Sequence, residues 1–274
     1  MKNLTGKVVA ITGAGSGIGR ELALQLAKQG VSLALNDFKA ETLAETIQLI
    51  DNQKITISSH VFDVSDKPAM YAFAENAIAT HGQVDMIINN AGFALSPIPI
   101  ADLTDDEIRH VLDVNLWGVI HGTKAFLPHL LKRPAATVVN ISSVFGMIGV
   151  MGQAPYVMSK FAVRGFTESL RMELYDTNVQ VTQVHPGGIK TNIVKNGRFR
   201  DGQDQGTAAS RFENNAPTTA ADAATTIIKG IQKKKNRVLI GKDARQIDIA
   251  QRLYPTNYVK SIRKIFLKMG LNKL

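Results

Sequence analysis

The stretch KVVAITGAGSGIGRELALQLAKQG, residues 7–30, decides the fold. Its first part, KVVAIT (7–12), is a short apolar run rich in β-branched residues, which is typical of a buried strand. That run leads directly into the glycine-rich turn TGAGSGIG (12–19). The remainder, IGRELALQLAKQG (18–30), has the apolar spacing of a helix that ends at Gly30. A strand, a glycine turn and a helix in this order predict the start of a parallel α/β sheet.

The same alternation continues along most of the chain. Further strands are predicted at 31–36, 55–61, 85–90, 136–142, 179–185 and 237–241. Helices are predicted at 40–51, 66–80, 104–132 (with a break near Asn115) and 154–176. This order indicates an α/β fold with a doubly wound, parallel, seven-stranded sheet and helices on both faces. Ligands of such sheets bind at the carboxyl ends of the strands.

The glycine-rich turn has the properties of a pyrophosphate site. Gly13, Gly17 and Gly19 permit a tight turn and a close approach of the backbone, and the following helix offers free N–H groups at its positive end. Asp37 ends the second predicted strand, where a carboxylate can bind the ribose hydroxyls and repel a 2′-phosphate. Its neighbours Asn36 and Phe38 are not basic, so the sequence favours NAD over NADP. The alternative is that Asp37 is an exposed turn residue.

Tyr156 and Lys160 are four residues apart in YVMSK and share one face of a predicted helix. A tyrosine hydroxyl, with a reference pKa of about 10, is a poor base at neutral pH. A nearby ammonium favours the phenolate and lowers that pKa, which makes proton exchange with an alcohol feasible. The pair alone is weak evidence, because this spacing also occurs by chance in helices.

Four further motifs accompany this pair, and they are NNAG (89–92), Asn115 in DVNLWG, NISS (140–143) and HPGGIKT (185–191). With TGAGSGIG and YVMSK, in this order and spacing, the chain resembles the short-chain dehydrogenase/reductase family over residues 4–241. The resemblance implies a Rossmann fold and an oxidoreductase acting on CH–OH groups. Gly188 is a departure that the family tolerates.

The resemblance also implies roles for individual residues. Tyr156 would exchange the proton with the substrate oxygen, Ser143 would hold that oxygen, and Lys160 would lower the pKa of Tyr156 and bind the nicotinamide ribose. Asn115 would fix a water that links Lys160 to solvent. The cofactor contacts implied are Gly13, Ser16, Gly17, Ile18, Gly19, Asp37, Asp63, Val64, Asn90, Ala91, Gly92, Tyr156, Lys160, Pro186, Gly187, Ile189 and Thr191.

Residues that follow the strand ends are expected to line the substrate pocket. The expected contacts are Phe93, Leu95, Ser143, Phe145, Met151 and Tyr156, with Ala94, Val144, Met147 and Val150 nearby. Most are apolar, which favours a lipophilic alcohol or carbonyl compound over a sugar. Alternatively, they only pack beneath the polar segment 193–217. That segment is interpreted as a lid whose arginines 198, 200 and 211 could meet an anion, or as a disordered insertion.

The composition sets limits on other functions. The 274 residues are 45% hydrophobic and include no cysteine, which excludes disulfides and thiol catalysis. No stretch approaches the ~20 apolar residues of a membrane span, and no signal peptide is recognised, so a cytoplasmic protein is expected. His121, His129 and His185 are not expected to be catalytic, and no histidine–carboxylate cluster has the spacing of metal ligands.

The positive charge lies at the C-terminus. Residues 229–274 contain 13 Lys/Arg and 2 Asp/Glu, whereas the other 228 residues contain 19 and 21, so a nucleic-acid partner is not expected. We therefore divide the chain into a catalytic domain, 1–242, and a basic extension, 243–274. Within the extension, 258–269 has an amphipathic pattern. This segment could dock on protein, which is the favoured interpretation, or contact an anionic membrane or an acyl-CoA.

The sequence as a whole predicts an NAD-dependent oxidoreductase that interconverts an alcohol and a ketone or aldehyde, with Tyr156 as general acid and base. The alternatives are a dinucleotide-sensing regulatory protein and a peripheral membrane protein on the same fold. A sensor has no need of all four implied catalytic residues, which are present here. The resemblance further implies a homodimer or homotetramer, in which the helices 115–132 and 156–176 pair across subunits.

Overall fold

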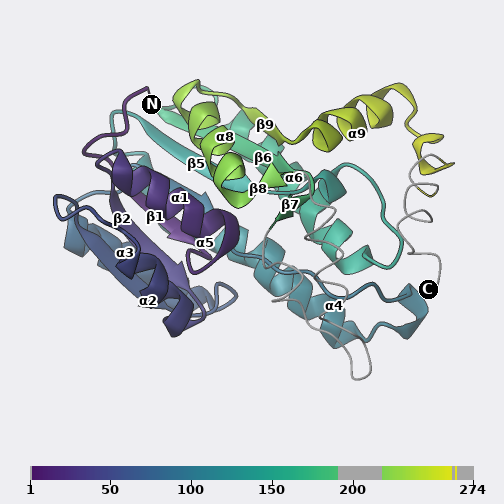
Figure 1. Ribbon diagram of the computed structural model, residues 1–274, viewed down its shortest axis with the longest axis horizontal. Coiled ribbons are helices and arrows are strands. Elements are labelled where there is room, and N and C mark those ends of the chain that lie inside the picture. The colour runs from purple at the N-terminus through teal and green to yellow at the C-terminus, as the bar shows by residue number, and fades with distance from the viewer. Residues whose placement is uncertain (1, 191–217, 261–262, 264–274) are drawn as a thin grey trace.

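A parallel seven-stranded sheet forms the centre of the protein in the computed structural model, which describes residues 2–190, 218–260 and 263 (Figure 1). The strand order is β3-β2-β1-β4-β5-β6-β9, and every neighbouring pair is parallel. The strands are β1 (Val8–Thr12), β2 (Ser32–Asp37), β3 (Ile57–Val61), β4 (Met86–Asn89), β5 (Ala136–Ile141), β6 (Val179–Pro186) and β9 (Arg237–Ile240). The predicted doubly wound sheet is confirmed.

Helices cover both faces of this sheet (Figure 1). They are α1 (Gly17–Lys28), α2 (Ala40–Gln48), α3 (Lys67–His81), α4 (Asp105–Leu112), α5 (Gly118–Leu130), α6 (Ala154–Glu173), α8 (Ala220–Gln232) and α9 (Lys242–Leu253). The expected break near Asn115 is present as a π-helical turn, Asp113–Trp117, between α4 and α5. Three further features were not predicted from the sequence: α8, α9 and the short pair of β7 (Ile189–Lys190) with β8 (Thr218–Thr219).

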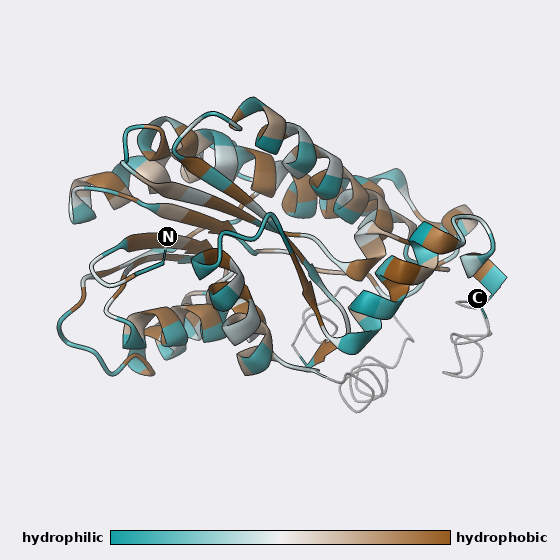
Figure 2. Ribbon diagram, turned by 90° about the horizontal axis from the view of Figure 1, so that it is seen from above, coloured by the Kyte–Doolittle hydropathy of each residue, from teal (hydrophilic) through white to brown (hydrophobic). Residues whose placement is uncertain are grey.

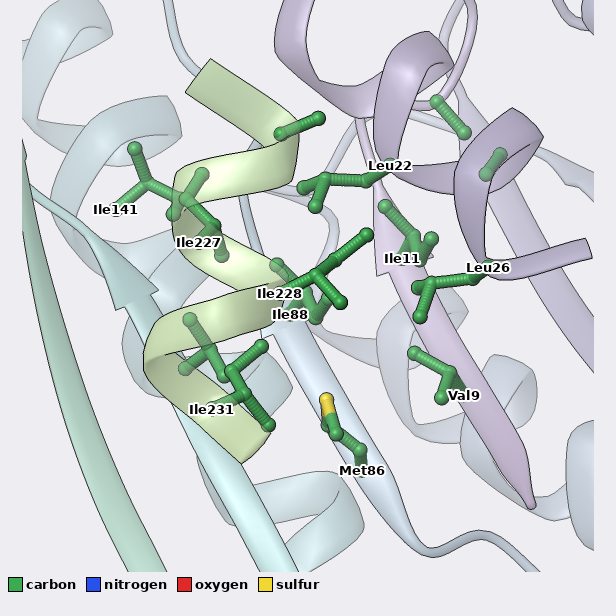
Figure 3. Packing of buried hydrophobic residues seen from close by; sticks show 14 of the residues in the cluster. Val9, Ile11, Leu22, Leu26, Met86, Ile88, Ile141, Ile227, Ile228 and Ile231 are labelled. Carbon is green, nitrogen blue, oxygen red and sulfur yellow. The ribbon is translucent and has the colours of Figure 1, made fainter. Parts of the chain in front are cut away.

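The core consists of two apolar clusters, one on each face of the sheet. On one face, α1 and α8 pack together over β1 and β4, as Figure 3 shows. The labelled side chains are Val9, Ile11, Leu22, Leu26, Met86, Ile88, Ile141, Ile227, Ile228 and Ile231. On the other face, Phe73 of α3 and Phe126 of α5 meet with ring centroids 5.3 Å apart. Because both faces of the sheet are covered, the central strands β1 and β4 are buried along their whole length, whereas the edge strand β3 is polar and has no buried residue. The strands are mostly brown in Figure 2.

The strand order reverses between β1 and β4, and ligands of such sheets bind beside this reversal, at the carboxyl ends of the strands. From β1 the chain proceeds to β2 and β3 on one side and then returns to β4 on the other. The glycine-rich turn follows β1, and the NNAG motif follows β4, so both reach the same edge of the sheet. The helices α2 and α3 lie at one end of the molecule, and α9 lies at the opposite end (Figure 1). Among the described residues, no helix is long and apolar enough to cross a bilayer.

Candidate active site

The glycine-rich turn after β1 excludes side chains at its glycine positions. Gly13 and Gly17 have φ angles of +67° and +54°, in the left-handed region that favours glycine. A side chain at Gly19 would overlap the carbonyl oxygen of Gly13. The Asn90 side chain also fixes the turn, since its Nδ2 donates to the carbonyl oxygens of Thr12 (2.9 Å) and Gly13 (3.1 Å). The turn therefore has a fixed shape, and no side chain of these glycines covers its backbone.

The N-terminus of α1 carries an uncompensated positive dipole. Ser16 is the capping residue, but its side chain makes no capping hydrogen bond, and the first turn contains no acidic residue. The first N–H groups of a helix have no partner within the helix, so they bind anions readily. Ile18, a predicted cofactor contact, packs against the core and anchors this end of the helix. The turn and the helix together fit a pyrophosphate group.

Asp37 is buried at the end of β2, so the alternative of an exposed turn residue is wrong. One carboxylate oxygen accepts from the Gly15 N–H at 2.8 Å, and the other accepts from the Lys39 N–H at 3.0 Å. These contacts place the negative charge directly beside the glycine-rich turn. The Phe38 side chain is 58% exposed, with the Lys39 ammonium 5.2 Å from its ring centroid.

The other predicted contacts on the adenine side lie after β3. Asp63 is exposed, and its carboxylate accepts from the backbone N–H and the hydroxyl of Ser65, at 2.9 and 2.8 Å. Val64 is buried against Gly118, the first residue of α5. A β-carbon added to Gly118 would lie only 2.7 Å from Val64 Cγ2. Val64 thus packs directly against the backbone at the start of α5.

Three of the four predicted catalytic residues meet around the first turns of α6. Ser143 follows β5 directly, while Tyr156 and Lys160 lie one turn apart on α6, and all three are buried. The Ser143 hydroxyl lies close enough to the Tyr156 hydroxyl to lower its pKa through a hydrogen bond. The Lys160 ammonium donates to the Ile141 carbonyl oxygen at 3.1 Å and lies 5.5 Å from the centroid of the Tyr156 ring. A reactive oxygen that contacts Ser143 would therefore also contact Tyr156.

The pKa of Tyr156 differs from the expectation. Burial raises it to about 12, and the hydrogen bond from Ser143 offsets only part of this rise. Burial also lowers the pKa of Lys160 to about 8. Lys160 is not among the causes of the shift in the pKa of Tyr156, which are burial and the Ser143 hydrogen bond. At neutral pH the tyrosine is consequently a protonated phenol, which is the form that donates a proton.

Asn115 is fully buried in the π-helical turn between α4 and α5. Its amide oxygen accepts from the Phe93 N–H at 2.9 Å, and its nitrogen donates to the Phe93 carbonyl at 2.9 Å and to Ser159 Oγ at 3.2 Å. A β-carbon at Gly92 would lie 2.9 Å from Asn115 Oδ1 and 3.4 Å from Lys160 Nζ. The loop after β4, the π-helical turn and α6 thus converge at Gly92. A π-helical turn is common at functional sites.

His185, at the end of β6, supports the site in a way that the sequence analysis did not predict. The side chain is fully buried, and Nδ1 donates to the Ser143 carbonyl oxygen at 2.9 Å, since a carbonyl can only accept. Burial lowers its pKa to about 4, so the ring is neutral at physiological pH. Its position directly before the PGG segment is the only sequence signal for this contact.

The predicted contacts on the nicotinamide side follow β6. Pro186 ends the strand, and the Gly187 N–H donates to the Ile240 carbonyl at 2.9 Å. Ile189 is buried in β7. The predicted contact Thr191, the lid 193–217 and its three arginines lie outside the described residues.

The predicted substrate residues lie on two neighbouring loops. Gln153 Nε2 donates to the Leu95 carbonyl at 3.1 Å and joins the loop after β4 to the loop after β5. The Phe145 ring meets the Tyr156 ring edge-on, with centroids 6.0 Å apart, and Met151 is exposed. Phe93 and Ala94 are half-buried, as is Val150.

Two of the residues expected near the pocket also pack against α9. Val144 and Met147 form a small buried cluster with Ala244 of α9. They contact α9 because the chain after β9 folds back over the loop that follows β5. The start of α9 is therefore packed against the catalytic body, and the division at residue 242 stays a prediction.

Of the predicted amphipathic segment 258–269, the structure describes only residues 258–260 and 263. Within this part, the Tyr258 hydroxyl oxygen accepts from the Gly149 N–H at 3.3 Å. This contact agrees with docking on protein, and the rest of the segment lies outside the described residues.

Deleting residues 256–274 is expected to lower the melting temperature by a few degrees. The deletion removes the hydrogen bond between Tyr258 and Gly149, which contributes about 1 kcal/mol to the free energy of unfolding. A loss of that size lowers the melting temperature of a chain of this length by a few degrees. Differential scanning calorimetry measures this shift, and Tyr258→Phe reports the share of the hydroxyl alone. An unchanged melting temperature and oligomeric state after the deletion would contradict docking.

Within the described ranges, no group of three or more histidine or carboxylate side chains is placed to hold a metal ion. The site instead combines the glycine-rich turn, whose backbone can bind a pyrophosphate, with the Asp37 carboxylate beside it. It also contains the buried phenol of Tyr156 next to the Ser143 hydroxyl. This arrangement suits a bound dinucleotide and the transfer of a proton to or from a substrate oxygen.

Comparisons with known proteins agree with this geometry. The model of the short chain dehydrogenase family matches residues 7–201. The putative oxidoreductase SadH of Mycobacterium tuberculosis is 42% identical over 266 residues, which cover 96% of each chain. Dehydrogenase/reductase SDR family member 7B of Rattus norvegicus is 33% identical over 86% of this chain and 74% of the rat protein. A short-chain dehydrogenase/reductase from Burkholderia phymatum, solved in complex with NAD, is 29% identical, with a TM-score of 0.81 over 87% of this chain and 90% of that one.

Proposed function

The chain belongs to the short-chain dehydrogenase family of oxidoreductases, and we propose that it uses NAD to interconvert an alcohol and a ketone or aldehyde. The observation that supports this proposal best is the burial of Ser143, Tyr156 and Lys160 side by side after β5 and on α6, with the Lys160 ammonium 5.5 Å from the centroid of the Tyr156 ring. A buried phenol and hydroxyl at one point can hold a substrate oxygen and exchange a proton with it.

The residues present fit a dinucleotide. The open backbone of the glycine-rich turn and the free N–H groups of α1 would hold the pyrophosphate. Asp37 would bind the adenosine ribose hydroxyls, and its negative charge favours NAD over the 2′-phosphate of NADP. When bound, the nicotinamide supplies the carbon that accepts or donates the hydride. NAD in the similar Burkholderia phymatum structure supports this assignment.

The proton would move through the Tyr156 hydroxyl. During carbonyl reduction, the protonated phenol gives its proton to the substrate oxygen, and Ser143 Oγ holds that oxygen in place. Lys160, with its pKa lowered to about 8, lies beside the phenol and helps to replace the lost proton. Asn115 fixes the loop of Phe93 and the adjoining part of α6 through its three hydrogen bonds.

The substrate is proposed to be lipophilic. Phe93, Leu95, Phe145 and Met151 lie on the two loops nearest to Tyr156, and all four are apolar. A screen of secondary alcohols, hydroxyacyl thioesters and steroids with NAD and NADP in parallel tests the proposal. Formation of NADH with at least one of these alcohols is the expected result, whereas failure to bind either dinucleotide would contradict it.

We expect the protein to form a dimer or a tetramer in solution. α5, α6 and the segments that flank them expose large apolar side chains, namely Trp117, Leu131, Met158, Phe161, Met172 and Tyr175. Phe126, which also lies on α5, is fully buried in the core and is not available to an interface. Light scattering at micromolar concentration should report at least twice the mass of one chain, and Phe161→Arg should reduce it. A monomer in the wild type would contradict this expectation.

A further inference from the structure

Two turns that contain glycine lie against each other, one after β6 (Gly187 and Gly188) and one after β9 (Gly241). The Asp243 side chain fills the space between them. The Gly187 N–H donates to the Ile240 carbonyl at 2.9 Å, which joins the two turns. The Asp243 carboxylate accepts from the Gly188 N–H at 2.7 Å. A β-carbon at Gly187 or at Gly241 would overlap this same carboxylate. Both glycines therefore leave room for one acidic side chain.

The Asp243 carboxylate lies on α9, and contacts with β9 and with the loop after β5 fix the position of this helix. Asp243 lies in the first turn of α9, where the positive end of the helix dipole stabilises a negative charge. The next residue, Ala244, is buried against Val144 and Met147. One turn further on, the Asp248 carboxylate forms a two-pronged ion pair with Arg237 of β9, at 2.6 and 3.0 Å. The position of Asp243 is thus set from both the strand and the loop after β5.

One oxygen of Asp243 has a further unusual property. Oδ1 is buried, and it has no hydrogen-bond partner among the described residues. A buried acceptor without a partner is destabilising, because it loses its hydrogen bonds to water. An apolar or smaller residue would avoid this cost but could not bind the Gly188 N–H. The acid is consequently better explained by the contact with the turn than by the stability of α9.

We propose that Asp243 is a positioning residue for the turn 186–188, which it holds in the shape that receives the nicotinamide end of the dinucleotide. This inference rests on the proposed function, because the assignment of Pro186 and Gly187 to the cofactor belongs to that proposal. The described contacts require the carboxylate to act through the backbone of the turn: it touches Gly188, and it excludes any side chain at position 187.

Asp243→Ala tests the proposal in the full chain, with two readouts. Amide hydrogen exchange over residues 186–190 should become at least tenfold faster, because the Gly188 N–H loses its acceptor. The Kd for NAD, measured by isothermal titration calorimetry, should rise about tenfold, equivalent to 1.4 kcal/mol. Asp243→Asn keeps an oxygen at the same place and should recover most of both properties. Asp106→Ala is the matched control, because Asp106 is an exposed acid in the first turn of α4 and its carboxylate lies 3.6 Å from Arg109 of the same helix.

The outcomes separate this inference from the proposed function. If exchange at 186–190 or the affinity for NAD stays within twofold of wild type in Asp243→Ala, the positioning role is refuted. An equal loss in the Asp106→Ala control would refute it as well, because the effect would then belong to helix ends in general. If the wild type binds neither NAD nor NADP, the proposed function fails, and the role of Asp243 toward a nicotinamide fails with it. In that case the exchange data show separately whether the carboxylate holds the turn.

Discussion

Tyr156→Phe should retain less than a few per cent of wild-type turnover and still bind NAD. The change removes one hydroxyl and keeps the ring that packs edge-on against Phe145. General acid–base catalysis by a positioned group contributes on the order of 10²–10⁴-fold, so the loss should fall in that range. Steady-state kinetics measure the turnover, and calorimetric titration measures the affinity for NAD in the same preparation.

The control for this substitution lies close to the same helix. Tyr175 follows the end of α6 and is 79% exposed, so Tyr175→Phe removes an identical hydroxyl without touching the site. It should leave both turnover and melting temperature unchanged. If Tyr156→Phe retained more than a few per cent of the wild-type rate while folded, another group would have to handle the proton, and the assignment of Tyr156 would be wrong.

The strands and the cofactor turn could be predicted because their signals are local. A strand buried on both faces is a continuous apolar run, and a turn that must admit a pyrophosphate has glycines where a β-carbon would clash, as at Gly19. The Tyr156–Lys160 spacing on one helical face is equally local. By contrast, α8 contains several β-branched residues, and α9 is largely polar, so packing on the body decides their structure more than intrinsic helix propensity does.

What the sequence could not predict depends on burial and on contacts between distant residues. The pKa of Tyr156 was expected to fall because Lys160 is near, but spacing alone does not show that both groups are desolvated or that the ammonium bonds to Ile141. Asp243 and Gly188 are 55 residues apart and meet only after β9 pairs with β6. The contact of His185 with Ser143 arises in the same way, across two neighbouring strands.

The double substitution Asp37→Ala/Phe38→Arg should shift the cofactor preference from NAD toward NADP. The ratio of kcat/KM for NADP to that for NAD is expected to rise on the order of 10²-fold, because the change removes a carboxylate that repels the 2′-phosphate and adds a guanidinium that binds it. Phe38 is exposed, so the arginine replaces no core residue. The ratio is the appropriate measure, because Asp37 also accepts from Gly15 and Lys39, and its loss weakens the turn for both cofactors.

Asp63→Ala is the matched control for this change of preference. It removes an equal charge from the same side of the sheet, but its carboxylate is bonded to Ser65 after β3, whereas that of Asp37 lies against the glycine-rich turn. If the preference depends on the position of the Asp37 charge, the control should alter kcat/KM for NAD and NADP by similar factors. A general effect of net charge would instead shift the ratio equally in both variants. A wild-type protein that already prefers NADP would show that a buried carboxylate beside Gly15 does not exclude the 2′-phosphate.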